Sequence, residues 1–586
     1  MRSLLPLGSA ALLLLLASLG CGPRARTSPS ADVIDGLAQS RSELDQAYDM
    51  VARMEEFERS PATVSVVSFL NNYLSEHPAD PKWQPDSLVS KLPRQLRTLP
   101  PVEQLNRLDV QLTDAVYLEE TYLLRTIGDW VTKTAPPAEL ANWVKSPEAK
   151  LDRDQGDAIL SAYALFDWTI RNLQLDPLPP VPKDAVAGPT GLDPALAALP
   201  APLRGQIGPG YAGVPLYVVL CGHGDAYQRM RVFTLLCRQQ GLDVVTLSTV
   251  DPSDPNRTRP WVSGVLLGQQ LYLFDAALGL PIPGPGGQGI ATLEQVRADT
   301  SLLRALDVDK ENPYDVAGDD IQNVTAQIDA SLEALSQRMQ IIEGGLIGDR
   351  QLQLTVAPSE QAERLRKSPG IANVNIWPAP IEATLFEIAL RESPIFDPNL
   401  RNIIRQERFL LEQRSQMAAA RHKHLRHQFS ETIEKKGAKQ LYLEARLSNE
   451  LIDSLATNKP LQDQMGLTAA LDEMDTPAEK MAYLESVKES LRLSKRNCSY
   501  WIGLVLYEDG DYKAAIDWLD QRTLQAEPKG FWVGGARYNL GRTYEQLAAY
   551  SLAQDFYVAD ESPQQQGNLV RAKRLSKLAA EAKAKP

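Results

Sequence analysis

Apolar residues change their spacing once along this chain, and that change predicts where a sheet can form. Over most of the length they recur every three or four residues, as in amphipathic helices. Between residues 214 and 280 they instead form short runs bounded by turn residues, so residues 244–250, 261–267 and 271–274 are predicted strands. A predicted helix over residues 225–240, ended by Gly241, precedes them. We therefore predict an α+β fold that is predominantly helical.

The chain has 586 residues, too many for one hydrophobic core, since a domain takes roughly 150 residues. We divide the chain by its patterns and by its Pro- and Gly-rich stretches. The predicted segments are a signal peptide (1–21), a tether (22–30), an N-terminal helical region (31–150), a central α+β domain (151–310), an α/β connecting region (311–395), long helices (396–480) and helical repeats (481–586). In the connecting region, residues 351–356 and 374–377 are predicted strands, which either extend the central sheet or form a small separate unit. One helix is predicted over residues 399–436, ending at Gly437.

The N-terminus has the layout of a secretory signal, with Arg2, an apolar run over residues 10–17 and small residues before Cys21. Residues 18–21, Ser-Leu-Gly-Cys, resemble a bacterial lipobox, although Ser18 stands where that motif has an aliphatic residue. We therefore expect lipidation at Cys21, which would anchor the protein to a membrane of the cell envelope, facing the periplasm or the exterior. An ordinary cleaved signal peptide is the alternative.

Charge and cysteine content exclude other classes of function. The formal net charge of −13 argues against a nucleic-acid partner, because a polyanion is bound by clustered Lys and Arg. After the lipobox only Cys221, Cys237 and Cys498 remain, too few for a disulfide scaffold and without CxxC metal spacing. A disulfide between Cys221 and Cys237 stays open.

Two further groups of residues have ligand-type side chains. His422, His424 and His427 share one predicted helix, but His422 and His424 point to different faces and basic residues surround them. The acidic pair Asp319-Asp320 lacks the oxygen-rich spacing of a calcium loop. We therefore expect no metal and no cofactor.

The central segment carries a pattern of motifs in a fixed order. These are Gly224-Asp225-Ala226, a helix containing Leu235-Leu236 and Arg238, the closing Gly241-Leu242-Asp243, then Arg259-Pro260-Trp261 and Leu273-Phe274-Asp275. Together they resemble the core of the transglutaminase-like superfamily, over roughly residues 155–285. The resemblance implies a papain-like α+β domain, flanked here by helical regions.

In that family a helix begins with a nucleophilic cysteine, and two following strands supply a histidine and an aspartate. The resemblance puts these three positions at Ala226, Arg259 and Asp275, so only the aspartate is kept. Alanine has no nucleophile and arginine cannot act as a base near neutral pH. We therefore predict that the site is not catalytic, and that Arg259 and Asp275 pair as a structural bridge.

A substitute nucleophile lies close by in the sequence. Cys221 and His223 are two residues apart, so in an extended segment both side chains can lie on one face. A cysteine hydrolase or acyltransferase that uses this pair is the alternative to a protein without catalysis. A half-buried cysteine at the end of a strand, beside a loop histidine, is the structural interpretation of the same residues.

A set of residues near the C-terminus recurs 38 positions later. Gly503, Gly510, Tyr512, Ala515 and Leu519 recur as Gly541, Ala548, Tyr550, Ala553 and Tyr557. They resemble two tetratricopeptide repeats, in which a small residue lets paired helices approach and aromatic residues fill the space between them. Generic helical hairpins are the alternative.

These patterns favour a non-catalytic envelope lipoprotein with a degenerate transglutaminase-like domain and a C-terminal α-hairpin repeat domain. We expect the repeats to bind a protein or peptide partner, and the lipid anchor to be the contact with the membrane. A spacer of the cell envelope that binds no small ligand is a third hypothesis.

Overall fold

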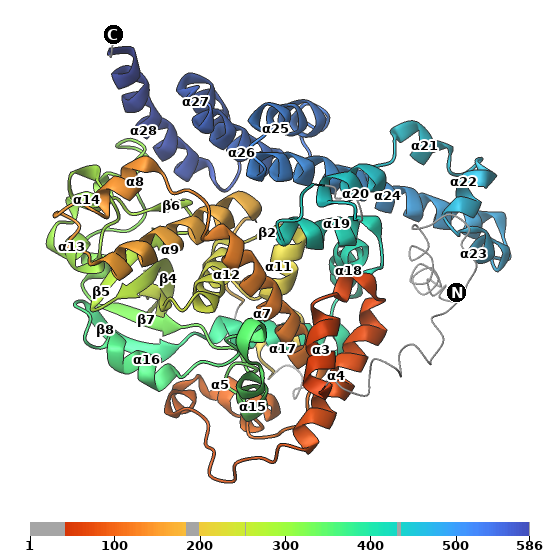
Figure 1. Cartoon of the computed structure of the whole chain (residues 1–586), viewed down its shortest axis with the longest axis horizontal. Helices are drawn as coiled ribbons and strands as arrows, with labels where there is room; N and C mark the ends of the chain where they lie inside the picture. The colour runs from red at the N-terminus through yellow and green to blue at the C-terminus, as the bar shows by residue number, and fades with distance from the viewer. Residues whose placement is uncertain (1–41, 183–198, 252–253, 431–434, 585–586) are drawn as a thin grey trace. The chain divides into compact units, whose positions relative to one another are not determined.

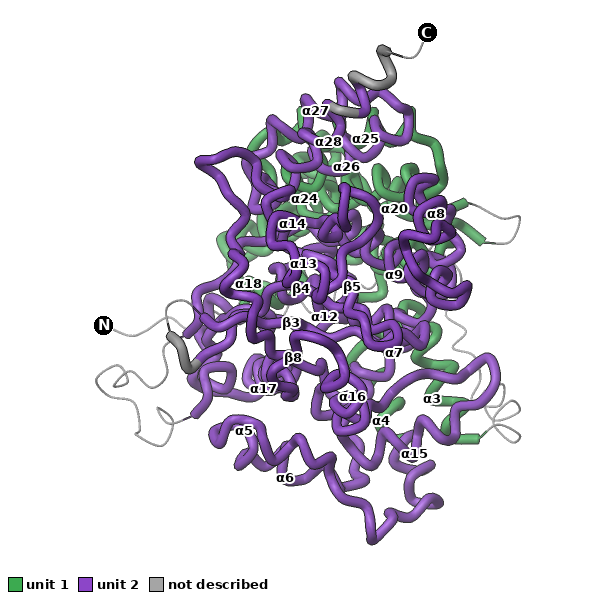
Figure 2. Tube along the Cα trace, turned by 90° about the vertical axis from the view of Figure 1, so that its left-hand side faces the viewer, with its two compact units in different colours: residues 1–69, 402–536 green, residues 70–401, 537–586 purple. Residues whose placement is uncertain are grey.

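The computed structural model describes residues 42–182, 199–251, 254–430 and 435–584 (Figure 1). It divides into two compact units, coloured separately in Figure 2. Unit 1 comprises Met1–Phe69 and Asn402–Ala536, and unit 2 comprises Leu70–Arg401 and Arg537–Pro586. The fold is α+β and predominantly helical, as predicted.

The expected signal peptide, tether and lipidation site at Cys21 lie outside the described residues. Within those that are described, the structure contains no helix with the length and apolar character needed to cross a membrane.

Unit 2 is built on a mixed sheet of six strands in the order β6-β5-β4-β3-β7-β8. The strands are β3 (Val244–Asp251), β4 (Asp254–Leu267), β5 (Gln270–Asp275), β6 (Leu280–Pro281), β7 (Val324–Ile328) and β8 (Ile371–Ile376). All neighbours are antiparallel except β7 and β8, which are parallel. The three predicted strands are confirmed as β3, β4 and β5. A separate parallel pair joins β1 (Gln174–Leu175) to β2 (His223–Gly224).

The side chains of β5 alternate between two faces of this sheet, as the pleat requires. Leu271 and Leu273 belong to a large hydrophobic cluster on one face. Phe274, which points the other way, contacts Phe166 of helix α9 (Arg153–Asn172) and Phe233 of helix α12 (Ala226–Gln239). Helix α12 packs on β3 and β4, so it covers the second face (Figure 1).

The connecting region does extend the central sheet, because β7 and β8 both come from residues 311–395. The predicted strand at 374–377 is confirmed as part of β8, but the strand predicted at 351–356 is wrong. There the backbone amides of Leu354 and Thr355 donate to the carboxylate of Glu343, at 2.8 and 2.6 Å. The Glu343 side chain thus accepts the hydrogen bonds that these two backbone amides would otherwise donate to a neighbouring strand.

Helices surround the sheet of unit 2. They are η4 (Ser87–Lys91), α5 (Arg94–Arg97), α6 (Pro100–Glu103), α7 (Leu112–Val131), α8 (Ala138–Trp143), α9, η5 (Ala201–Arg204), α11 (Pro215–Cys221), α12, η6 (Pro285–Gly287), α13 (Leu293–Ala298), α14 (Ser301–Arg304), η7 (Asp319–Ile321), α15 (Gln337–Gly345), η8 (Gly348–Arg350), α16 (Pro358–Leu365), α17 (Pro378–Glu392), α27 (Tyr550–Val558) and α28 (Gln565–Ala584). The helix predicted over 225–240 is confirmed as α12, and Gly241 after it has a φ of +71°.

Unit 1 is helical. Its elements are α3 (Glu43–Val51), η3 (Met54–Glu56), α19 (Gln416–Leu425), α20 (Ala438–Ala445), α21 (Asn449–Ser454), α22 (Lys459–Gln464), α23 (Thr468–Asp472), α24 (Pro477–Glu508), α25 (Tyr512–Leu519) and the π-helix η9 (Asp520–Leu524). The unit boundaries fall within α4 (Arg59–Ser75), α18 (Pro398–Glu412) and α26 (Val533–Gln546).

The single helix predicted over 399–436 is wrong, because the chain breaks it at Ser415 into α18 and α19. The Ser415 hydroxyl accepts from the amide of Ala418 and donates to the carbonyl of Leu410, both at 3.0 Å. A serine that bonds to backbone on both sides favours a new helix start over continuation. Gly437, predicted to end a helix, precedes the first residue of α20 instead.

The compact units also differ from the predicted segments. Residues 151–310 and 311–395 share one sheet, so a boundary at 310 would cut hydrogen-bonded strands. The predicted repeat segment 481–586 is divided after Ala536, with α24 and α25 in unit 1 and α27 and α28 in unit 2. Hydrophobic spacing along the chain identifies helices but not which of them share a core.

Candidate functional site

Ala226, the position at which the resemblance implies a nucleophile, is the first residue of α12. The helix is capped by Asp225, whose carboxylate accepts from the amides of Tyr227 and Gln228, both at 2.9 Å. Its other oxygen accepts from the amide of Gly210 at 2.8 Å. The Asp225 side chain is buried, and burial raises its pKa while these amides lower it. The amides that could stabilise a reacting anion at this helix end are therefore already bonded to the chain's own carboxylate.

Asp275 ends β5 and is fully buried. One oxygen accepts from the amides of Ala277 and Leu278, both at 2.9 Å, and the other accepts from the hydroxyl of Tyr314 at 2.5 Å. Tyr314 in turn accepts from the indole of Trp261 at 2.7 Å. Burial raises the pKa of Asp275, and these donors oppose the rise. The carboxyl group thus holds a turn and a loop in place.

Arg259 lies on β4 and pairs with Asp315 at 3.1 Å. The predicted bridge between Arg259 and Asp275 is therefore wrong, because each has a different partner. Both partners are adjacent in one loop, with Tyr314 lying 39 residues after Asp275 and Asp315 lying 56 residues after Arg259. Nothing in the sequence of this loop predicts these contacts, apart from the turn-forming polar run Asn312-Pro313-Tyr314-Asp315.

Cys221 and His223 do lie close together, within 4.8 Å measured from the Cys221 Sγ to a ring nitrogen of His223. His223 also contacts Asp176, with 2.6 Å between its Nδ1 and the Asp176 Oδ2. The parallel pairing of β1 with β2 sets this contact, because His223 lies on β2 and Asp176 directly follows β1. A thiol, an imidazole and a carboxylate are thus brought together in unit 2, and the carboxylate was not predicted because Asp176 lies 47 residues before His223 in the sequence.

The backbone around Cys221 differs from the predicted extended segment. Cys221 is the last residue of helix α11, and Gly222 follows with a φ of +81°. The Cys221 side chain is buried, and its residue is 8% exposed. Cys237, inside α12, is fully buried, which raises its pKa. The disulfide left open between Cys221 and Cys237 does not form, since both residues are thiols.

Of the three histidines between residues 422 and 427, His424 of α19 takes part in a buried polar network of unit 1. His424 lies 3.2 Å from the carboxylate of Glu508 through Nε2 and 3.3 Å from the hydroxyl of Tyr442 through Nδ1. Burial and three nearby arginines hold the pKa of His422 well below its ordinary value. His427 has a φ of +59° and stacks edge-on against Phe429.

The predicted repeat residues lie at helix contacts. A Cβ at Gly503 of α24 would lie 2.6 Å from the Leu519 side chain, and one at Gly541 of α26 would collide with Tyr557 of α27. Glycine at these positions thus permits each helix pair to approach. Ala515 and Ala553 are buried, and Tyr512 and Tyr550 each begin the second helix of a pair.

The turns of the two hairpins also match. Gly510 and Ala548, which are equivalent in the 38-residue offset, both have positive φ, at +81° and +54°. The left-handed conformation is costly for a residue other than glycine. Two hairpins therefore share both the close contact and the turn geometry.

Comparison of the chain with protein-family models, with curated proteins and with solved structures gave no match.

Proposed function

We propose that this protein is a non-catalytic binding protein of the bacterial cell envelope, anchored by lipid at Cys21. Its central domain has a transglutaminase-like fold that serves recognition or support, and its C-terminal helical hairpins are tetratricopeptide-like repeats that bind a protein or peptide. The observation that carries the proposal is the chemistry at the three family positions. Alanine replaces the nucleophile at Ala226, while Arg259 and Asp275 are each held by other residues.

A second candidate is a cysteine hydrolase or acyltransferase with Cys221 as nucleophile. It is favoured by one observation, the contact of His223 with Asp176 at 2.6 Å, because a carboxylate that orients an imidazole beside a thiol is the arrangement used in such enzymes. In this candidate His223 would take the thiol proton and Asp176 would orient the ring.

Thiol labelling separates the two candidates. Protein carrying Cys21→Ser is treated with an electrophilic probe across pH, and Cys221→Ala is the control that identifies labelling at this residue. We expect slow labelling of Cys221 until denaturant is added, because the side chain is buried and ends a helix. Fast labelling with an apparent pKa well below ~8.5, lost in Asp176→Asn, would refute the non-catalytic proposal and support the hydrolase.

A further inference from the structure

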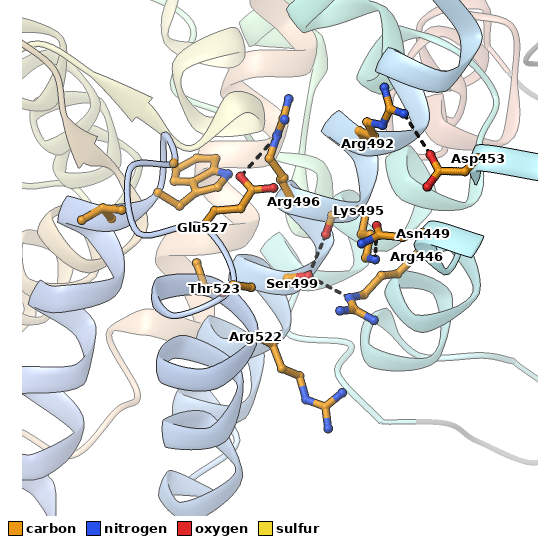
Figure 3. Close-up of a pocket in the computed structure, with 14 residues that line it drawn as sticks. Arg446, Asn449, Asp453, Arg492, Lys495, Arg496, Ser499, Arg522, Thr523 and Glu527 are labelled. Carbon is orange, nitrogen blue, oxygen red and sulfur yellow. Dashed lines mark hydrogen bonds and ion pairs between the residues drawn. The ribbon is translucent and has the colours of Figure 1, made fainter. Parts of the chain in front are cut away.

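Unit 1 contains a positively charged cleft with a volume of about 360 Å³ (Figure 3). It is lined by α24, by residues 446–453 and by residues 522–533. Five cations line it, namely Arg446, Arg492, Lys495, Arg496 and Arg522, against two carboxylates, Asp453 and Glu527. A local excess of positive charge is notable in a chain whose net charge is −13. Such a concave, charged surface raises the local concentration of anions.

Three of the five cations have carboxylate partners. Arg492 pairs with Asp453 at 3.0 Å, and Figure 3 shows this contact. Arg496 lies 3.8 Å from Glu527, as the same figure shows. Arg522 pairs with Asp517 at 2.9 Å. These pairs hold the walls of the cleft and offset part of its charge.

Arg446 and Lys495 differ from the other three, since neither forms an ion pair with a carboxylate of the described residues. Arg446 donates to the Ser499 hydroxyl at 2.8 Å and lies 5.3 Å from the Trp518 ring centre. Lys495 donates to the side-chain oxygen of Asn449 at 2.5 Å. Both contacts orient a charge without neutralising it.

Burial and a neighbouring cation act on each of these two side chains. The pKa of Arg446 is lowered by burial and then by the charge of Arg522. The pKa of Lys495 is lowered by burial and then by the charge of Arg446, whereas the more weakly acting charges of Glu450, Glu527 and Asp453 oppose the shift. An anion placed between them would relieve the repulsion and replace lost hydration, because charge-assisted hydrogen bonds to a carboxylate are among the strong ones.

We propose that this cleft binds the carboxylate side chains of an acidic peptide segment, with Arg446 and Lys495 as its carboxylate-binding residues. The inference rests on the proposed function, in which the helical hairpins bind a protein or peptide, and it names the chemistry of that ligand. The cleft is larger than one oxyanion requires, and its lining mixes cations with Asp453, Glu527 and the hydroxyl of Thr523. A peptide supplies both carboxylates for the cations and N–H groups for the acceptors, whereas a dense polyanion would be repelled by the two carboxylates.

The test uses the full chain and a fluorescein-labelled peptide of alternating Glu and Gly, with the matched Gln-Gly peptide as the uncharged control. Binding is followed by fluorescence anisotropy at low ionic strength, where charge contacts are least screened. We expect the Glu peptide to bind about tenfold or more tightly than the Gln peptide, a difference of about 1.4 kcal/mol, because the neutral amides of the Gln peptide make no charge-assisted hydrogen bonds with the cations. Arg446→Gln and Lys495→Gln should each weaken the Glu peptide by a similar factor.

Lys513→Gln is the matched control, because Lys513 lies on α25 outside the cleft and is exposed. It should leave binding unchanged, and Lys495→Arg should restore most of the affinity lost in Lys495→Gln. Circular dichroism checks that each variant is folded. Equal affinity for the two peptides, or full affinity in Arg446→Gln, would overturn the inference. Binding of inorganic phosphate as tight as that of the peptide would also overturn it, in favour of a site for a small anion.

The failure of this inference and the failure of the proposed function give different results. If an acidic peptide binds but the cleft variants do not weaken it, peptide binding by the protein stands and this cleft is excluded. If Cys221 proves to be a fast nucleophile, the non-catalytic proposal fails whatever the cleft binds.

Discussion

Glu120 gives a pH dependence that can be measured. It lies on α7 and is 4% exposed, and its carboxylate accepts from the amide of Leu216 at 3.0 Å. Burial raises the pKa of Glu120 from 4.5 to about 8, although the nearby charge of Arg231 and the Leu216 amide oppose the rise. The folded protein therefore holds this proton over a pH range in which the unfolded chain has released it.

Because the folded pKa is the higher one, stability from this group is complete below pH 4.5 and is lost as pH rises towards 8. At pH 7 the pH is about 2.5 units above the pKa of this group in the unfolded chain. Ionisation of the unfolded chain therefore lowers the free energy of unfolding by about 3 kcal/mol relative to pH 4.5. The variant Glu120→Gln removes the titration, and its amide oxygen can still accept from Leu216. We expect this variant to be more stable than the parent at pH 7 by up to about 3 kcal/mol, and equal to it near pH 4.

The assay is urea unfolding at pH 5, 6, 7 and 8, with hydrogen exchange of the α7 amides to follow unit 2 itself. Glu363→Gln is the control, since Glu363 lies on α16 and is exposed. The stability difference between Glu120→Gln and the parent should grow from pH 5 to 8, and Glu363→Gln should show no such growth. A difference that stays constant with pH, or a variant less stable than the parent at pH 7, would refute the reasoning about burial.

Two further predictions concern the turns and the buried tyrosine. Positions 510 and 548 both have positive φ, which glycine adopts at little cost and alanine does not. Ala548→Gly should therefore stabilise the protein by about 1 kcal/mol, and Gly510→Ala should destabilise it by a similar amount, both measured by thermal unfolding. Tyr314→Phe leaves the carboxyl group of Asp275 without its hydroxyl donor and should cost about 1–3 kcal/mol, whereas an unchanged melting temperature would show that water replaces the hydroxyl.

Helix α12 and strand β5 were predicted well because the residues that begin, end or orient each of them lie within or next to the element itself. Helix α12 begins at a capping aspartate and ends before Gly241, which has the positive φ that favours glycine. In strand β5, Leu271 and Leu273 point to one face of the sheet and Phe274 points to the other. This alternation follows from the spacing of the residues alone.

Elements whose state depends on distant contacts were predicted less well. Residues 215–221 are continuously apolar, and such a short run fits a buried helix and a buried strand equally, so only the packing of α11 against α7 and α12 decides between them. The segment after residue 350 has strand-like composition but gives its amides to Glu343. Partners that lie far away in sequence cannot be identified from local composition.

The same limit applies to the candidate site. The sequence shows alanine at position 226, where the resemblance implies a nucleophile, but it does not show the partners of Arg259 and Asp275. Tyr314 and Asp315 reach Asp275 and Arg259 from a loop whose sequence has no catalytic or binding signature. An aspartate at a position that a resemblance assigns to catalysis is therefore weak support for catalysis until its hydrogen-bond donors are known.

The positions of two helix ends bear on whether Cys221, close to Ala226 in the sequence, can act as a nucleophile. A thiolate is stabilised at a helix N-terminus and destabilised at a C-terminus, where carbonyl groups point outward. The N-terminus of α12 begins with alanine and is capped by Asp225, whereas Cys221 ends α11. The thiol thus lies at the unfavourable end of its helix, and catalysis would depend on His223 and Asp176 overcoming both burial and this dipole. Labelling of Cys221 that stays slow in the parent and is unchanged in Asp176→Asn is the result this geometry predicts.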